Sequence, residues 1–287
     1  MTETKLSPPT LRCRHGNLSL LRPAVAGILN ITPDSFHDGG LYQSETAVLK
    51  RVGQMLEEGA ALIDIGAVSS RPGADQLSVE EELKRLIPII KVVRKTFPKV
   101  LISADTFVAS VAQVALDAGA DMINDIYGGS LNNGLAELAG KEKVPYILMH
   151  MQGNPETMQK APFYKNVRTE VETFFKERIK LLTQKGVEQI ILDPGFGFGK
   201  TVTHNYELLN GLDTFTALGY PVMAGLSRKS MINKVLGISQ KEALNGTTAV
   251  NMIALLKGAL LLRVHDIKEA VQTIRIFEQL KDPSKPV

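Results

Sequence analysis

The stretch ALDAGADMINDI, residues 115–126, contains the pattern that decides the fold. An amphipathic segment ends at Gly119, and an apolar run with polar residues at its end follows. Glycine adopts the left-handed conformation that ends helices at little cost, so the stretch reads as the end of a helix and the strand after it. The same pattern recurs at residues 55–66, 182–195 and 255–266. The chain is therefore predicted to alternate helices with strands.

Eight apolar runs of strand length lie along the chain. They cover residues 25–31, 61–67, 100–106, 122–127, 145–150, 190–194, 221–226 and 259–265. Such near-continuous runs are typical of parallel strands whose outer face is covered by helices. Helical periodicity lies between them, most clearly at residues 78–97, where Ser78 and Glu81 predict a capping box. Eight such units predict a TIM (β/α)8 barrel, whereas the alternative, a doubly wound open sheet, usually has fewer strands.

Length and composition agree with a single barrel domain. Of the 287 residues, we assign 23–282 to the barrel and 1–22 to an N-terminal extension or short hairpin. The formal net charge of +3 includes no long Lys or Arg block, which argues against a nucleic-acid partner. The apolar runs are shorter than the roughly 20 residues that cross a bilayer, and the N-terminus lacks the apolar core of a secretory signal. We therefore expect a cytoplasmic protein with no membrane partner, whose one cysteine, Cys13, excludes an internal disulfide.

Polar side chains collect at the ends of the predicted strands, where the active site of a TIM barrel forms. They are Asn30, Asp64, Asp105, Asn124, His150, Asp193, Lys229, Arg263 and His265. A single Asp at a strand end is usually a helix cap or turn former, and that interpretation suffices for Asp64. Asp105, Asn124 and Asp193 lie in runs that otherwise look buried, where a polar group needs a partner, so we expect them to face a ligand. For His150 we favour a structural role.

The types of these side chains predict a class of substrate. Carboxylates and amides suit a flat heterocycle with N–H donors, and a nearby Lys suits its carbonyl acceptor. Arg263 and His265, two residues apart on one strand, point to the same side of it. With Ser70 and Arg71 on a facing loop, they predict an anion site. The combination indicates a heteroaryl phosphate ester or diphosphate.

The glycine-rich segment DPGFGFGK, residues 193–200, invites a phosphate-binding P-loop interpretation. Its spacing rejects that interpretation, because Pro194 stands where the motif needs its first glycine. A loop that places Phe196 or Phe198 against an aromatic substrate is more economical, and we expect one of the two to be only a hydrophobic anchor.

Eight motifs occur in order along the chain. They are GILNITPDSFHDGG (27–40), DIGAVSSRPGA (64–74), SADT (103–106), INDI (123–126), MHMQGNPETM (149–158), DPGFGFGK (193–200), SRKS (227–230) and RVHD (263–266). This set resembles the dihydropteroate synthase family over residues 25 to 266. The resemblance implies a TIM barrel enzyme of folate biosynthesis that joins (7,8-dihydropterin-6-yl)methyl diphosphate to p-aminobenzoate, giving 7,8-dihydropteroate and diphosphate. It also implies a homodimer and a target of sulfonamides, which mimic p-aminobenzoate.

The resemblance assigns a role to each matching position. The pterin would be held by Asp105, Asn124, Asp193 and Lys229. Asn30 would ligate the Mg²⁺ bound to the diphosphate, while Arg263 and His265 would hold the diphosphate and Arg263 would stack on the pterin. The catalytic residues would be Asp105, Asp193, Lys229 and Arg263.

The resemblance also assigns the p-aminobenzoate pocket, and here the chain departs from the family. Ser70 and Arg71 would close over the leaving group, and Pro72, Phe198 and the stem of Lys229 would complete the pocket. The common motif G-G-E-S-T-R-P-G reads Gly-Ala-Val-Ser-Ser-Arg-Pro-Gly at residues 66–73, so that Val68 replaces Glu and Ser70 replaces Thr. We expect this change to affect p-aminobenzoate affinity more than the chemistry.

Three other functions compete with this interpretation. A pterin-dependent methyltransferase would share Asp105 and Asn124 but has no use for Arg263, His265 and the Asn30 metal site. A pterin-binding protein without activity finds its only support in Val68. A TIM-barrel aldolase or lyase, with Lys229 as a Schiff-base residue, rests on analogy of fold alone.

Overall fold

The fold is a closed barrel of eight parallel strands. The computed structural model describes residues 10–31, 40–68, 77–129, 134–153 and 158–284, with the backbone alone for residues 40–44. The barrel strands are β3 (Ala24–Asn30), β4 (Leu62–Gly66), β5 (Leu101–Asp105), β6 (Met122–Asp125), β7 (Tyr146–Met149), β8 (Ile190–Asp193), β9 (Met223–Ala224) and β10 (Leu261–Val264). They follow the order β8-β7-β6-β5-β4-β3-β10-β9. A parallel bridge between Leu192 and Val222 joins β8 to β9. The predicted TIM barrel is confirmed, and the open-sheet alternative was wrong.

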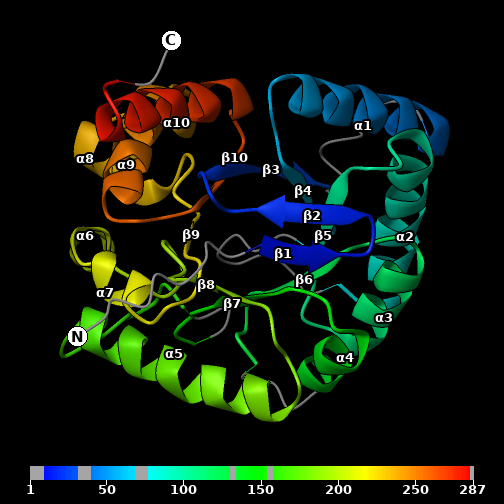
Figure 1. The fold of residues 1–287 in the computed structure, drawn as a ribbon, viewed down its shortest axis with the longest axis horizontal. Helices are drawn as coiled ribbons and strands as arrows, with labels where there is room; N and C mark the ends of the chain where they lie inside the picture. The colour runs from blue at the N-terminus through cyan, green and yellow to red at the C-terminus, as the bar shows by residue number, and fades with distance from the viewer. Residues whose placement is uncertain (1–9, 32–39, 69–76, 130–133, 154–157, 285–287) are drawn as a thin grey trace.

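Helices alternate with the strands and surround the barrel (Figure 1). They are α1 (Gly40–Glu57), α2 (Val79–Thr96), α3 (Ala109–Asp117), α4 (Leu135–Glu142), α5 (Val167–Gln184), α6 (Val202–Asn210), α7 (Asp213–Thr216), α8 (Ser230–Leu236), the 3₁₀ turn η2 (Gln240–Glu242), α9 (Leu244–Leu256) and α10 (Ile267–Lys281). Ser78 caps α2 as predicted, because its side chain accepts a hydrogen bond from Glu81 N at 3.2 Å. The Glu81 carboxylate instead accepts from Arg85 Nε at 2.7 Å. In the part of the chain that the structure describes, none of the helices is long and apolar enough to cross a membrane.

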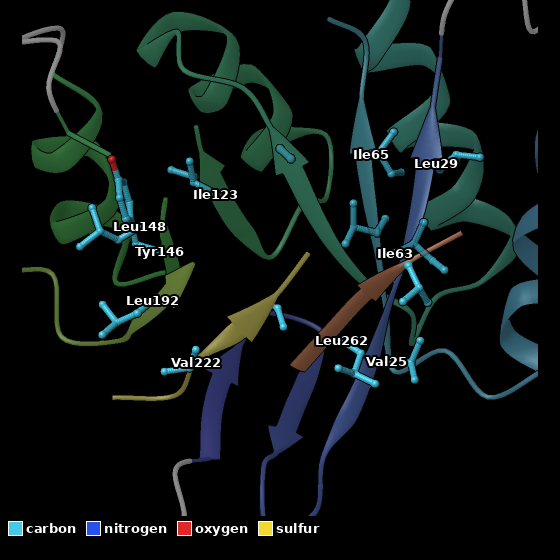
Figure 2. Close-up of a cluster of buried hydrophobic side chains, with 14 of the residues drawn as sticks. Val25, Leu29, Ile63, Ile65, Ile123, Tyr146, Leu148, Leu192, Val222 and Leu262 are labelled. Carbon is cyan, nitrogen blue, oxygen red and sulfur yellow. The ribbon is translucent and has the colours of Figure 1, made fainter. Parts of the chain in front are cut away.

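Alternation along the strands divides their side chains between two environments. One set packs outward under the helices, as Figure 2 shows for Val25, Ile63, Ile123 and Leu262 among others. The other set forms the apolar lower part of the barrel interior. It comprises Ala26, Leu62, Leu101, Met122, Ile147, Ile191, Met223 and Leu261. Two residues further along the strands the same interior rows become polar, at Asp64, Ser103, Asn124, Asp193 and Arg263. The barrel thus changes from a packed core to a charged site within one layer.

A hairpin covers the apolar end of the interior. Strands β1 (Thr10–Cys13) and β2 (Gly16–Ser19) pair antiparallel, and Leu11, Leu18 and Leu20 pack into the lower interior cluster. The hairpin lies across the end of the barrel in Figure 1. This closed end leaves the opposite mouth, where the strands terminate, as the place for a ligand.

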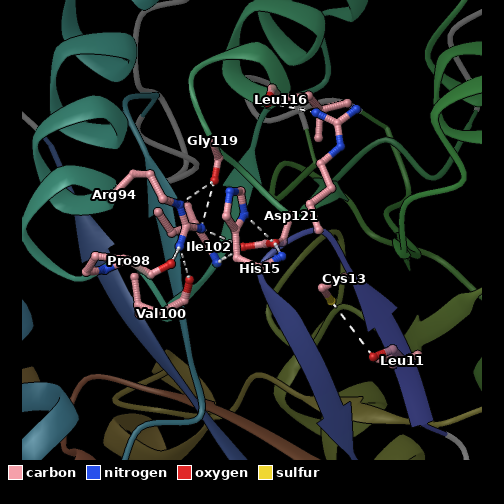
Figure 3. Close-up of polar contacts among 11 residues, drawn as sticks. Leu11, Cys13, His15, Arg94, Pro98, Val100, Ile102, Leu116, Gly119 and Asp121 are labelled. Carbon is pink, nitrogen blue, oxygen red and sulfur yellow. Dashed lines mark hydrogen bonds and ion pairs between the residues drawn. The ribbon is translucent and has the colours of Figure 1, made fainter.

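Buried charge fixes the hairpin to the barrel (Figure 3). The fully buried carboxylate of Asp121 accepts from Arg94 Nη2 at 2.7 Å, from Ile102 N at 2.9 Å and from His15 N at 3.0 Å. These donors come from three parts of the fold, so the carboxylate holds together the hairpin, α2 and the start of β5. A buried carboxylate with several donors of this kind is well compensated.

Candidate active site

Polar side chains from neighbouring strands meet at the barrel mouth. The parallel register aligns Asn30 of β3 with Gly66 of β4, Gly66 with Asp105 of β5, and Asp105 with Asn124 of β6. Gly66 has no side chain to crowd the Asp105 carboxylate. A Cβ at this position would lie only 3.3 Å from Asp105 Oδ2. Asn124 is buried, Asp105 is partly buried, and Asn30, the last residue of its strand, is exposed. The structure therefore brings three of the predicted site residues into one row.

Arg263 links this row to a carboxylate that the sequence interpretation undervalued. Its Nε donates to Asp64 Oδ2 at 2.6 Å, and its Nη2 donates to Asp105 Oδ2 at 2.8 Å. Asn124 Nδ2 also donates to Asp64 Oδ2, at 3.1 Å. Asp64 is 1% exposed and faces the interior, so its interpretation as a turn former was wrong. The run Leu-Ile-Asp-Ile-Gly carried the signal, a carboxylate inside an apolar strand, that had identified Asp105.

Asp193 and Lys229 form the other side of the mouth. Asp193 Oδ1 accepts from Gly195 N at 2.7 Å. A Cβ at Gly225 would lie 3.6 Å from Asp193 Oδ2 and 3.9 Å from Lys229 Nζ, so both groups face the space that this glycine leaves open. Lys229 Nζ lies 4.5 Å from the centre of the Phe198 ring and donates to the Phe196 carbonyl oxygen.

The two loop phenylalanines have different surroundings. Phe196 is fully buried in the main core, whereas Phe198 belongs to a separate cluster at the mouth with Ile126, Met149 and Met158. The Phe196 side chain has the buried surroundings expected of the hydrophobic anchor. Phe198 is the aromatic side chain that lies beside Lys229.

The pKa values of four charged groups at the mouth are perturbed, those of Asp105, Asp193, Lys229 and Arg263. Burial, with Asp64 nearby, raises the pKa of Asp105 to about 7, and burial raises the pKa of Asp193 against the opposing effect of Lys229. Burial also lowers the pKa of Lys229 to about 8. For Arg263, burial would lower the pKa, but Asp64 and Asp105 more than offset it and raise the pKa. Perturbed groups facing one space are typical of functional sites.

His265 lies next to this cluster as a neutral group. Its Nδ1 lies 3.0 Å from Ser227 Oγ, and Arg51 Nη2 donates to its carbonyl oxygen at 2.6 Å. Burial and the charge of Arg263 lower its pKa to about 4, so near pH 7 the ring is a hydrogen-bonding group and not a cation. Of the two strand residues predicted for the anion site, Arg263 is therefore the cation.

Three predicted residues and a metal remain to be placed. Ser70, Arg71 and Pro72 lie outside the described residues. Among the residues that are described, no group of three or more His, Cys, Asp and Glu side chains is arranged to hold a metal ion. The 6% exposed His150 contacts buried Lys200, which the sequence interpretation had not singled out.

The fold and the mouth together define a barrel enzyme that recognises a polar heterocycle, and comparison with known proteins specifies the class. Residues 26–265 match the family described as pterin binding enzyme. The chain is 46% identical over 264 residues to dihydropteroate synthase of Escherichia coli (strain K12), covering 91% of this chain and 93% of that protein. Against the enzyme of Haemophilus influenzae the identity is 46% over 263 residues, with 91% and 95% covered.

Solved structures give the same result. A Yersinia pestis dihydropteroate synthase with a sulfonamide drug complex has a TM-score of 0.88 and 42% identity, covering 95% of this chain and 99% of that one. A Xanthomonas albilineans dihydropteroate synthase in complex with 7,8-dihydropteroate has a TM-score of 0.85 and 38% identity, covering 97% and 100%. The chain belongs to the dihydropteroate synthase family, the transferases of folate biosynthesis. The resemblance found in the sequence is confirmed, and the methyltransferase, binding-protein and aldolase interpretations were wrong.

Proposed function

We propose that the pterin ring of (7,8-dihydropterin-6-yl)methyl diphosphate binds in the barrel mouth among Asp105, Asn124, Asp193 and Lys229. The observation that carries this proposal is the meeting of these side chains, from separate strand ends, around the space beside Gly66 and Gly225. Carboxylate and amide oxygens accept the ring N–H groups, and the Lys229 ammonium donates to the ring carbonyl. The Xanthomonas albilineans relative, described in complex with 7,8-dihydropteroate, supports a pterin as the kind of ligand that this family binds.

The charges of the mouth suit the bond that breaks. When the C–O bond to the diphosphate breaks, positive charge develops on the pterin and negative charge on the leaving group. Three carboxylates, on Asp64, Asp105 and Asp193, face two cations, on Arg263 and Lys229. With all five ionised the cluster has one excess negative charge, which stabilises the developing pterin cation without reorganisation.

The diphosphate is proposed to lie between Arg263, His265 and Asn30. Arg263 supplies the cation, and neutral His265 supplies a hydrogen bond. Asn30, exposed at the end of β3, would offer an amide oxygen to Mg²⁺, a hard ion that prefers oxygen ligands and keeps several waters when it binds substrate phosphates. Bound Mg²⁺ would neutralise charge on the leaving diphosphate.

The p-aminobenzoate ring is proposed to lie against Phe198 and the stem of Lys229, with Pro72 completing the pocket and Ser70 and Arg71 closing over the leaving group. The phenylalanine ring and the ammonium at 4.5 Å from its centre form one aromatic and cationic surface. Such a surface suits an aromatic carboxylate. The arylamine of this substrate is already neutral at pH 7, so the attack on the pterin methylene needs no strong base.

We propose that the enzyme is a homodimer that works in the cytoplasm. Exposed apolar side chains gather on the adjacent helices α8, α9 and α10. They are Val235, Leu236, Ile253, Leu256, Ile276 and Leu280. Large exposed apolar side chains on neighbouring helices are typical of an interface. The chain's one cysteine, Cys13, is consistent with a reducing compartment.

The test is diphosphate release from the pterin diphosphate, with and without p-aminobenzoate and Mg²⁺. We expect release to require both substrates and to fall by at least about 100-fold, or about 2.7 kcal/mol, in Asp105→Ala. Asp117→Ala, at an exposed aspartate of α3, is the matched control. In Asn30→Ala the Mg²⁺ concentration for half-maximal rate should rise. Wild-type rates in Asp105→Ala would contradict the proposed pterin site.

A further inference from the structure

A buried ammonium group lies behind the active-site loop. Lys200 is 3% exposed, and its Nζ donates to the carbonyl oxygens of Gly195 and Phe198 at 2.9 Å each. The same Nζ lies 2.9 Å from His150 Nδ1 and 3.3 Å from the His150 carbonyl oxygen. An ammonium has three donors, so three short contacts satisfy it. We name this arrangement the Lys200 cage, formed by Lys200, His150 and the carbonyls of Gly195 and Phe198.

The cage surrounds a group whose charge is costly to bury. Burial, and the charge of Lys229, lower the pKa of Lys200, and burial with the adjacent Lys200 lowers the pKa of His150. A lysine that only filled space would be replaced at lower cost by an apolar side chain, because a desolvated ammonium needs strong partners. The carbonyl dipoles meet that need only while the loop keeps its present path.

The loop packs against the backbone of residues 150–152 so closely that no side chain fits between them. A Cβ at Gly195, where φ is +65°, would lie 1.9 Å from the His150 carbonyl oxygen. At Gly199, where φ is +61°, it would lie 2.4 Å from the Gln152 carbonyl oxygen. Only glycine fits either position. The loop is therefore pressed against the 150–152 segment, and the cage lies at this junction.

The other face of the same loop forms part of the active site. Gly195 N donates to Asp193 Oδ1, the Phe196 carbonyl accepts from Lys229 Nζ, and the Phe198 ring lies beside that ammonium. A Cβ at Gly197 would lie 3.1 Å from Lys229 Cδ. The carbonyl groups of this loop therefore accept hydrogen bonds from two lysines. Those of Gly195 and Phe198 accept from Lys200, and that of Phe196 accepts from Lys229.

We propose that Lys200 is a positioning residue for p-aminobenzoate: its buried ammonium fixes the loop so that Phe198 and Lys229 keep the relative placement that the second substrate requires. This inference rests on the proposed placement of p-aminobenzoate against Phe198. Of the proposed pterin contacts, Asp105 and Asn124 lie at strand ends away from the loop, and Asp193 and Lys229 adjoin it. Asp193 is itself the last residue of its strand, so most of the pterin site is held by the strands rather than by the loop. Removal of the Lys200 charge therefore acts mainly on the second substrate.

The first experiment compares Lys200→Met, which keeps most of the volume and loses the charge, with wild type. We expect the KM for p-aminobenzoate to rise at least tenfold while the Kd of a dihydropterin without diphosphate changes less than threefold. Lys84→Met, at an exposed lysine of α2, is the matched control and should keep wild-type values. A residue that only fills the core would leave both constants unchanged in Lys200→Met, and that result would overturn the inference.

The second experiment separates charge from shape. Lys200→Ala removes three methylenes and the ammonium, which together correspond to n-propylammonium. We expect millimolar n-propylammonium to lower the raised KM for p-aminobenzoate of Lys200→Ala at least threefold, and n-propanol, of the same size without charge, to leave it raised. Equal effects of the two guests, or none, would overturn the inference.

Two further variants keep the test decisive. If Lys200→Met and Lys200→Ala fail to fold by circular dichroism, His150→Leu, which removes one partner of the ammonium and leaves the lysine, takes their place. A raised KM for p-aminobenzoate would support the inference and an unchanged KM would overturn it. Phe198→Ala tests the underlying placement: an unchanged KM there would reject the proposed pocket, whereas a raised KM with a wild-type KM in Lys200→Met would reject only the role of Lys200.

Discussion

Pterin affinity should be lost at acid pH, and replacement of Asp64 by Asn should move the midpoint of this loss, here called the acid limb, to lower pH. In the proposed site, Asp105, whose pKa burial and Asp64 raise to about 7, is a stronger acceptor for a pterin N–H when it is ionised. In the wild type, affinity for the pterin should therefore increase as the pH rises through about 7, because binding favours the deprotonated carboxylate. Asp64→Asn removes the nearest negative charge, and the pKa of Asp105 must fall.

The structure sets the size of this change. Arg263 Nη2 lies 2.6 Å from Asp64 Oδ2 and 2.8 Å from Asp105 Oδ2, so the two oxygens are at most about 5.4 Å apart. At an effective dielectric constant of about 20, two unit charges about 5 Å apart repel by about 3 kcal/mol. Since one pKa unit corresponds to about 1.4 kcal/mol, and Arg263 screens part of the repulsion, the midpoint should fall to about pH 5–6.

The assay is calorimetric titration with 6-hydroxymethyl-7,8-dihydropterin between pH 5 and 8. This ligand carries no diphosphate, so no phosphate titration overlaps the limb. Asp105→Asn, which should lack the limb, reports any titration of the ligand itself. Thermal unfolding of each variant verifies that Asp64→Asn is folded over the range. A midpoint in Asp64→Asn that stays near pH 7, or rises, would refute the electrostatic coupling between the two carboxylates.

Two other predictions concern the second loop and the assembly. Val68→Glu, which restores the charge of the common family motif, should change the KM for p-aminobenzoate in steady-state assays and keep kcat within several-fold; a collapse of kcat would show that this loop is arranged differently. If the proposed dimer forms through α8, α9 and α10, wild type should sediment as a dimer in analytical ultracentrifugation and Leu256→Glu combined with Ile276→Glu as a monomer. Phe163→Glu, at a residue that is 71% exposed on another part of the chain, should sediment as wild type does.

Those features of the fold that repeat along the chain could be predicted from the sequence. Gly119 and its equivalents at Gly59, Gly186 and Gly258 have positive φ in the structure, as expected for residues that end helices. Each is followed by a buried strand, because an apolar run between two helices has no other place to bury both faces. Asp105, Asn124 and Asp193 were found for the same reason, as polar groups inside such runs.

Features that depend on closure of the barrel could not be predicted in this way. Asp64 and Arg263 are 199 residues apart in sequence. They meet because only one strand, β3, lies between β4 and β10 in the closed sheet, and both side chains point into the barrel. His15 and Asp121 meet only because the hairpin folds back over the end of the barrel. The burial of Lys200 was missed because most of its partners are main-chain carbonyls, which any sequence supplies and no pattern marks.

The apolar end of the barrel offsets the electrostatic cost of the charged mouth. Three carboxylates close together in a low-dielectric interior oppose folding, and two cations offset them only in part. The interior below them is filled by side chains such as Leu62, Met122 and Ile191, and the hairpin closes it from water. That packed layer stabilises a barrel whose mouth is electrostatically unfavourable without its ligand. In the proposed pterin site, positive charge that develops on the ring in the transition state would relieve this imbalance, so the same excess charge that weakens the free protein would lower the barrier of the reaction.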